Sequence, residues 1–243
     1  MREWFETAFG EFYPILYAHR DDVSAAQEVE GLIEVLGRPD RFTRVLDVGC
    51  GGGRHAAALV GLGAHLYGID LSAPLVTEAA HRPELRGRMV RGDMRELPFG
   101  AAFDLVVNLF TSFGYFADDH ENERALREMA RVLRPGGRMV IDHIHRRHLE
   151  DHLVAEDERE GEGYRVRQRR TLTPRRIQKE ITVTWDSGKT QEFIEDVRLY
   201  SPGELTALLR AGGLTDIDLY GSFDGGVLAP ESKRMIAVAV KPD

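Results

Sequence analysis

The chain has 243 residues, of which 42% are hydrophobic and 30% are charged, so it is long enough to build one sizeable core. Its formal net charge of −8 disfavours nucleic acid as a partner, because no overall positive field attracts a polyphosphate backbone. Cys50 is the only cysteine, which excludes an intrachain disulfide and a cysteine-rich zinc site and fits a reducing compartment.

The first residues, MREWFETAFGEFYPILY, are acidic and aromatic rather than a basic region followed by an apolar run. They are therefore not expected to be a signal peptide. No apolar stretch approaches the roughly 18 to 20 residues that a membrane-spanning helix needs. We expect a cytoplasmic protein without a membrane partner.

Large apolar residues from Trp4 to Tyr17 follow a helical spacing, which Pro14 breaks or kinks. Their aromatic face packs on the core or closes over a ligand pocket. A second helical pattern covers 25–36. Residues 1–40 are therefore predicted to form an N-terminal helical cap.

The chain is organised around the segment RVLDVGCGGGR, residues 44–54. A short apolar run ends at Val48, and glycines follow at positions 49, 51, 52 and 53 before a predicted helix. Glycine is needed where the backbone takes a positive φ or approaches a ligand closely, and a helix N-terminus offers unpaired N–H groups. This strand, turn and helix predict a ligand cradle.

The spacing of the glycines distinguishes between ligands. Counted from Gly49, the dinucleotide pattern G-x-G-x-x-G would require a glycine at Arg54, so that pattern does not fit. The pattern D-x-G-x-G-x-G fits, with Asp47, Gly49, Gly51 and Gly53 in register. It resembles the first motif of the class I S-adenosylmethionine-dependent methyltransferases. An ordinary glycine-rich turn is the alternative.

Two further acidic residues follow predicted strands. Asp70 ends the strand HLYGID, where an ionised carboxylate can accept from both hydroxyls of a ribose. Asp93 and Met94 match the family's adenine-facing pair, in which the carboxylate accepts from the exocyclic amine and the thioether packs on the ring. In both places a turn aspartate is the alternative. The resemblance implies cofactor contacts by Asp47, Gly49, Gly51, Asp70, Leu71, Asp93 and Met94.

The apolar run FDLVVNL predicts a buried parallel strand, and FTSFGYF follows it at the carboxyl edge of the sheet, where doubly wound folds bind ligands. Family members with a similar stretch line the cofactor and substrate space with it, which adds Asn108, Leu109 and Phe110 to the implied contacts. The segment YPILY resembles the Y-D-x-L-Y stretch of small-molecule methyltransferases, whose first tyrosine reaches the cofactor. This adds Tyr13, although Pro14 replaces the acidic residue.

The phrase ARVLRPGG resembles the family's helix and turn before its fifth strand, predicted here at 138–141. After that strand, an acidic run is followed by a strongly basic one with alternating apolar residues. Three antiparallel strands are predicted at about 164–172, 177–185 and 190–200. The basic residues either form a solvent-exposed face of this insertion or bind an anionic substrate. Related enzymes use additions here to shape the substrate pocket or a dimer contact, so a homodimer remains open.

A helix from Ser201 and strands at 216–223 and 234–241 complete the chain. The predicted fold is a single α/β domain over 1–243, with a Rossmann-like seven-stranded methyltransferase sheet and helices on both faces. A small antiparallel β insertion, residues 163–200, separates strands five and six. The resemblance places the last strand antiparallel in the sheet.

The predicted fifth strand is followed by DHIHRRH. Alternate residues of an extended segment face one side, but His143 and His145 have no obvious carboxylate partner, so no metal site is expected. A general base is needed only for a hydroxyl or a protonated amine. His143 and His145 are then the candidate catalytic residues, with a solvated loop as the alternative.

The resemblance implies methyl transfer from S-adenosylmethionine to a small-molecule oxygen, nitrogen or carboxylate, leaving S-adenosylhomocysteine. The sulfonium methyl group is already activated, so the transfer needs in-line positioning at about 3 to 3.5 Å and exclusion of water. A non-catalytic cofactor-binding protein remains an alternative. A nicotinamide-dependent oxidoreductase is disfavoured by the glycine spacing and by the ARVLRPGG turn.

Overall fold

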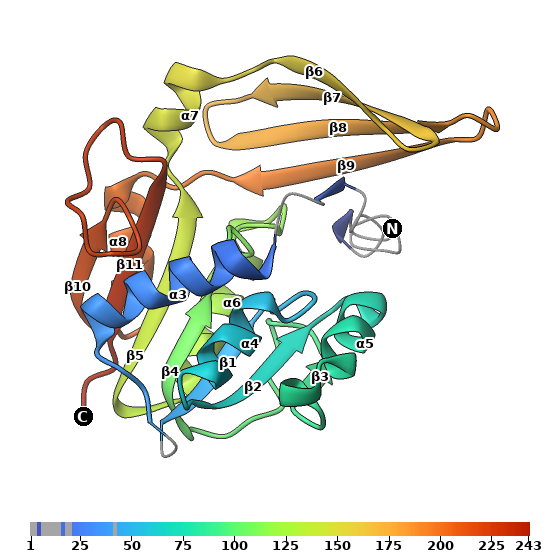
Figure 1. Cartoon of the computed structure of the whole chain (residues 1–243). Coiled ribbons are helices and arrows are strands. Elements are labelled where there is room, and N and C mark those ends of the chain that lie inside the picture. The colour runs from blue at the N-terminus through green and yellow to red at the C-terminus, as the bar shows by residue number, and fades with distance from the viewer. Residues whose placement is uncertain (1–3, 6–15, 18–20, 41–42) are drawn as a thin grey trace.

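The computed structural model describes residues 4–5, 16–17, 21–40 and 43–243, which form two β-sheets and the helices around them (Figure 1). The strands of the larger sheet are β1 (Arg44–Val48), β2 (His65–Asp70), β3 (Met89–Arg91), β4 (Phe103–Asn108), β5 (Leu133–Ile144), β10 (Thr215–Tyr220) and β11 (Arg234–Val240). Their order in space is β10-β11-β5-β4-β1-β2-β3, and β11 alone runs antiparallel to both of its neighbours. The predicted α/β methyltransferase sheet is confirmed, including its antiparallel last strand.

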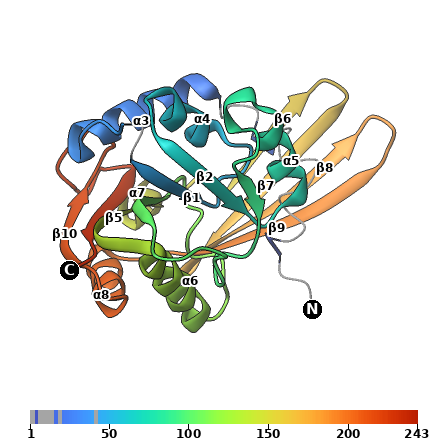
Figure 2. The same ribbon diagram turned by 90° about the horizontal axis from the view of Figure 1, so that it is seen from below.

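Helices cover both faces of the larger sheet. These helices are α3 (Asp22–Leu36), α4 (Arg54–Gly61), α5 (Ala73–His81), α6 (Asp119–Val132) and α8 (Pro202–Ala211), with a 3-10 turn η1 at Pro83–Leu85. Helix α7 (Arg146–His152) instead follows the end of β5 and leads to the smaller sheet (Figure 1). Figure 2 shows α3 and α4 on one side of the sheet and α6 and α8 on the other. In the described part of the chain, no helix has the length and apolar character needed to cross a bilayer.

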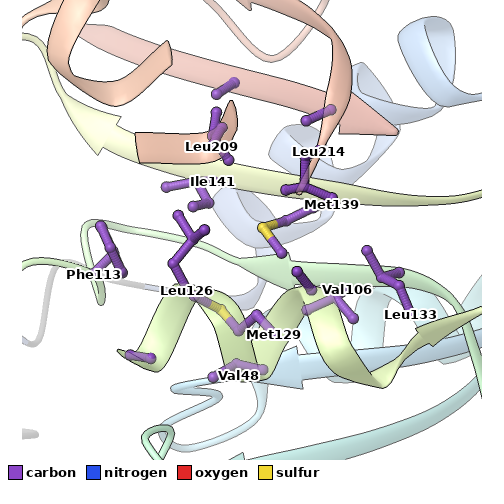
Figure 3. Close-up of a cluster of buried hydrophobic side chains, with 14 of the residues drawn as sticks. Val48, Val106, Phe113, Leu126, Met129, Leu133, Met139, Ile141, Leu209 and Leu214 are labelled. Carbon is purple, nitrogen blue, oxygen red and sulfur yellow. The ribbon is translucent and has the colours of Figure 1, made fainter. Parts of the chain in front are cut away.

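The strands contribute to two cores because successive side chains point to opposite faces. Leu46 and Val48 of β1 pack in the cluster that includes Leu126 and Met129 of α6, and Figure 3 shows Val48 beneath these two α6 side chains. Val45, on the other face, packs with the residues of α3 and α4. Burial on both faces explains why β1 is apolar after Arg44 except at Asp47.

The smaller sheet is antiparallel and consists of β6 (Glu156–Gly161), β7 (Tyr164–Leu172), β8 (Arg176–Trp185) and β9 (Thr190–Arg198). The three predicted strands are present, and β6 is a fourth that was not predicted. Its sequence, EDEREG, has no apolar alternation. It pairs with the basic strand β7, so that Glu156 lies opposite Arg169 and Glu160 opposite Arg165. The acidic and basic runs of the sequence are therefore cross-strand partners.

The N-terminal region connects the two sheets. The helix predicted over 25–36 is present as α3, with Asp21 capping its first turn. Leu16 and Tyr17 pack against one face of the smaller sheet, on a cluster formed by Val166, Ile181, Val183 and Phe193. Most of the predicted helix from Trp4 to Tyr17 lies outside the described residues, so the N-terminal cap stays a prediction.

The turn that starts α4 should not tolerate a side chain at Gly53. This residue has φ +77°, and a Cβ there would lie 2.5 Å from Leu85 Cδ1 and 3.0 Å from Ala79 Cβ. We expect Gly53→Ala to lower the free energy of unfolding in urea by about 2 to 4 kcal/mol, through backbone strain and overpacking. The matched control is Gly61→Ala in the same helix, where a Cβ meets nothing within 4 Å. It should raise stability by about 0.5 to 1 kcal/mol. Equal effects of the two variants would contradict this account.

Candidate active site

A cavity of about 280 Å³ opens at the carboxyl edge of β1, β2 and β4. Its wall combines the glycine turn after β1 with the segments that follow β2, β3 and β4. Among the residues predicted for the cofactor, those that line it are Asp47, Gly49, Gly51, Asp70, Leu71, Asp93, Met94, Leu109 and Phe110. These residues come from four separate segments of the sequence, and the parallel strands bring them to one edge of the sheet.

The glycine turn lies close to the loop after β4. The N–H groups of Gly49 and Cys50 both donate to Ile69 O, at 2.8 and 3.2 Å, which anchors the turn to the end of β2. Gly49 has φ +75°, and a Cβ on it would lie 2.8 Å from Ser112 Cβ. Only glycine permits both this backbone conformation and this close approach.

Asp70 fixes the shape of the turn from the neighbouring strand. One carboxylate oxygen accepts from Gly51 N–H at 2.8 Å and the other from Ser72 N–H at 2.8 Å. Burial raises the pKa of Asp70 from its ordinary value, whereas these backbone hydrogen bonds lower it. Because each carboxylate oxygen has a second lone pair, Asp70 can also accept from two hydroxyls of a ligand in the cavity.

Asp47 is a buried acid on the cavity wall. It is 2% exposed, and within the described residues its Oδ2 atom has no hydrogen-bond partner. Burial, with the charge of Asp70 as a second cause, raises the pKa of Asp47 to about 7. A buried carboxylate with an unpartnered oxygen favours a cationic ligand group.

Asp93 is held by Arg95, whose guanidinium lies 2.6 Å from its carboxylate. Burial alone would raise the pKa of Asp93, but the hydrogen bonds from Arg95 lower it below the ordinary value. Arg95 also pairs with Glu121 at 3.0 Å. The Asp93 carboxylate therefore stays ionised and its orientation is fixed, as an acceptor for an exocyclic amine requires.

Asn108, also predicted for the cofactor, is not among the described residues that line the cavity, and Tyr13 cannot be compared with it. Asn108 is fully buried, and its Nδ2 donates to Val48 O at 2.8 Å, so it ties β4 to β1 behind the cavity. Tyr13 lies outside the described residues. Neither assignment gains support from the arrangement of the described wall.

The two candidate catalytic histidines lie away from the cavity. His143 is completely buried in β5, its Nδ1 lies 3.0 Å from Ile144 O, and its ring packs against Tyr200 at 5.6 Å. Burial lowers the pKa of His143 to about 4. His145 Nδ1 lies 2.9 Å from Ser232 O. The segment considered as a loop is the end of β5 followed by α7. Both histidine side chains therefore contact main-chain atoms of the fold, and neither is among the residues that line the cavity.

His55 lines the cavity and was not singled out from the sequence. Its Nε2 lies 2.6 Å from the carboxylate of Glu28 in α3. Burial lowers the pKa of His55, and Glu28 opposes that shift, so the imidazole is neutral near pH 7. The position two residues after the last glycine of the turn is the only sequence signal for His55, because Glu28 lies far away along the chain.

Phe110 and Thr111 follow β4 with φ +59° at both residues. The left-handed region costs a residue that has a Cβ roughly 1 to 2 kcal/mol, and two such residues in succession need support from their surroundings. The Phe110 ring lines the cavity and lies 4.6 Å from the guanidinium of Arg54. This backbone strain is thus located on the wall of the candidate site.

Aromatic side chains form another part of the wall. Phe5, Tyr17, Tyr115 and Phe116 line the cavity, and the rings of Phe5 and Phe116 meet edge to face at 5.4 Å. Tyr17 connects the cavity to the smaller sheet, since its hydroxyl accepts from Lys179 Nζ at 2.5 Å and donates to Glu195. Lys179 and Glu195 are opposite each other in β8 and β9.

Comparison with known proteins agrees with this arrangement. Residues 45–137 match a family model described as a methyltransferase domain. A curated relative, the dTDP-3-amino-3,4,6-trideoxy-alpha-D-glucopyranose N,N-dimethyltransferase of Streptomyces venezuelae, is 30% identical over 139 residues. That match covers 57% of this chain and 58% of the relative, so it spans less than two thirds of the relative's length.

Solved structures match nearly the whole chain. The sugar N-methyltransferase KedS8 from Streptoalloteichus sp ATCC 53650 is 28% identical, with 100% of this chain and 98% of that chain covered and a TM-score of 0.76. S-adenosylmethionine-bound CalS10, an amino pentose methyltransferase from Micromonospora echinaspora, is 25% identical, with 95% and 97% covered and a TM-score of 0.70. The chain is thus similar to methyltransferases, over residues 45–137 to the family model and over nearly its whole length to these two solved structures.

Proposed function

We propose that this protein transfers a methyl group from S-adenosylmethionine to the amino nitrogen of a small, sugar-like acceptor. The observation that carries the proposal is the cavity itself, whose wall combines carboxylates at the strand ends with aromatic side chains. The relatives named above support a sugar acceptor, because all three are named for methyl transfer to sugars and two of them for transfer to nitrogen.

The proposed cofactor contacts follow from the geometry of the wall. Asp70 accepts from the ribose hydroxyls, Asp47 faces the ammonium group, and Asp93 with Met94 holds the adenine ring. When bound, the cofactor supplies a methyl group activated on a sulfonium sulfur. The chain then has to hold the acceptor in line and exclude water. The remaining residues that we assign to this site are Gly49, Gly51, Leu71, Leu109 and Phe110.

On the acceptor side we propose that Tyr17, which lines the cavity and packs on the smaller sheet, covers the cavity together with that sheet. An amine that arrives protonated must lose a proton before its nitrogen can attack. His55 is our candidate to take up this proton, because its neutral imidazole lines the cavity. His143 and His145 are not part of this proposal.

A cytoplasmic location and a homodimer are also proposals. The single, buried cysteine supports a reducing compartment. A dimer formed through the edge of the smaller sheet would place β9, which carries the exposed Ile194, at the contact. Light scattering on the purified protein measures its molar mass and tests the dimer directly.

The test of the function is methyl transfer to a defined amine. Incubation with S-adenosylmethionine and dTDP-3-amino-3,4,6-trideoxy-alpha-D-glucopyranose should yield a methylated amino sugar and S-adenosylhomocysteine by mass spectrometry. The same sugar nucleotide with a hydroxyl in place of the amine is the matched control and should stay unmodified. Binding of the cofactor without transfer to this amine, or to a panel of related amino sugars, would favour a non-catalytic cofactor-binding protein.

The role of Asp70 is tested by its removal. We expect Asp70→Ala to weaken S-adenosylmethionine binding by about 1.5 to 3 kcal/mol in calorimetric titration, the range for a charged hydrogen bond. Asp104→Ala is the control, because Asp104 also accepts from a backbone N–H, that of Arg44 at 2.7 Å, but at the amino end of the strands. An unchanged affinity in Asp70→Ala would refute the assignment.

Asp47 should limit the stability of the ligand-free protein. Its pKa of about 7 lies above the ordinary value of 3.8, so the stability that it contributes is fully present below about pH 4 and is lost as pH rises through 7. We therefore expect Asp47→Asn to be more stable than the wild type at pH 8, by at most about 4 kcal/mol, and equal to it near pH 4. Its affinity for S-adenosylmethionine should fall. Urea unfolding at both pH values measures the difference, and a pH-independent difference would contradict the prediction.

A further inference from the structure

A buried ion pair lies directly behind the strained residues Phe110 and Thr111. Asp142, at the end of β5, has no exposed side-chain surface, and Arg234, at the start of β11, is 22% exposed. Arg234 Nε donates to one carboxylate oxygen of Asp142 at 2.7 Å and Nη2 donates to the other at 2.7 Å. This two-point contact fixes the plane of the guanidinium relative to the carboxylate.

The same two residues hold the backbone after β4. Phe110 N–H donates to Asp142 Oδ2 at 2.7 Å, and Thr111 N–H donates to the main-chain oxygen of Asp142 at 3.0 Å. Arg234 Nη2 also donates to Thr111 Oγ1 at 2.9 Å. Both residues with φ +59° are therefore held by hydrogen bonds to Asp142 and Arg234.

The ion pair also contacts the ring that reaches the cavity. The Arg234 guanidinium lies 5.3 Å from the centroid of the Phe110 ring, and the guanidinium of Arg54 lies 4.6 Å from it. Phe110 and Arg54 line the cavity, whereas Arg234 and Asp142 are not on its wall. Arg234 therefore contacts the cavity wall through Phe110 and its neighbours.

We propose that Arg234 is a positioning residue for the cofactor site. Together with Asp142 it keeps Phe110 and Thr111 in the left-handed conformation and sets the direction of the Phe110 ring at the cavity. Lysine cannot replace it, because a single ammonium group cannot contact both carboxylate oxygens and the Thr111 hydroxyl in one plane. The inference concerns the cofactor alone, so it does not depend on the acceptor proposed above.

The alternative is that the pair only joins β5 to β11 and stabilises the sheet. A double-mutant cycle separates the two roles, with Arg234→Lys, Phe110→Leu and the combined variant. Calorimetric titration with S-adenosylmethionine and with S-adenosylhomocysteine gives the affinities of the folded protein. Thermal melting of the same samples reports stability.

We expect Arg234→Lys to weaken cofactor binding about tenfold in the wild-type background and to have no further effect when Phe110 is already leucine. The control is Arg138→Lys at the opposite end of the β5–β11 pair, where Arg138 donates to Leu36 O at 2.6 Å. It should lower the melting temperature and leave both affinities unchanged. A milder variant, Thr111→Val, removes only the hydroxyl that accepts from Arg234 and should weaken binding about threefold.

Two results would overturn the inference. One is an Arg234→Lys protein that melts at a lower temperature but binds both ligands with wild-type affinity, which would make the pair purely structural. The other is a loss of affinity of the same size in the wild-type and Phe110→Leu backgrounds, which would show that Arg234 does not act through Phe110.

Discussion

The site depends on one carboxylate that shapes a turn. Asp70 accepts from the N–H groups of Gly51 and Ser72 and so holds the connection from β1 to α4 against the end of β2. With the turn held in this way, Gly49 can approach Ser112, and Gly53 can pack against α5 and η1. Both contacts leave no room for a side chain. The cavity is therefore shaped by backbone geometry first, and the side chains on its wall are placed by that geometry.

The wall of the same cavity brings two acidic side chains close together in a buried environment. Asp47 and Asp70 both have raised pKa values, chiefly because they are buried, and the charge of Asp70 contributes to the shift of Asp47. Such a pair destabilises the empty protein at neutral pH, and a cationic ligand group relieves the repulsion. S-adenosylmethionine, the cofactor that we propose for this site, carries an ammonium and a sulfonium group. On that proposal the wall is more complementary to the loaded state than to the empty one, a common trade-off between binding and stability.

The sequence predicted those parts of the fold and site that depend on neighbouring residues. The segment from Arg44 to Arg54 contains a strand, a turn and the start of a helix. The spacing of its residues was therefore enough to predict the ligand-binding turn. Pairings between distant segments were not predictable. Glu28 contacts His55 only because α3 and α4 lie side by side. Arg234 contacts Asp142 only because β11 pairs with β5. His143 and His145 show the converse, because both side chains are buried, one in β5 and one at the start of α7, and their Nδ1 atoms lie next to main-chain oxygens.

Strand β6 determines what the smaller sheet presents to its surroundings. It is an edge strand whose residues from Glu156 to Glu160 are all charged, and its partners on β7 are largely arginines. An unpaired strand edge is a template on which another chain can add, and a row of charges makes that addition unfavourable. The acidic run therefore protects one side of the sheet from aggregation. At the opposite edge of the sheet, pairing of a new strand with β9 carries a smaller electrostatic penalty than pairing with β6.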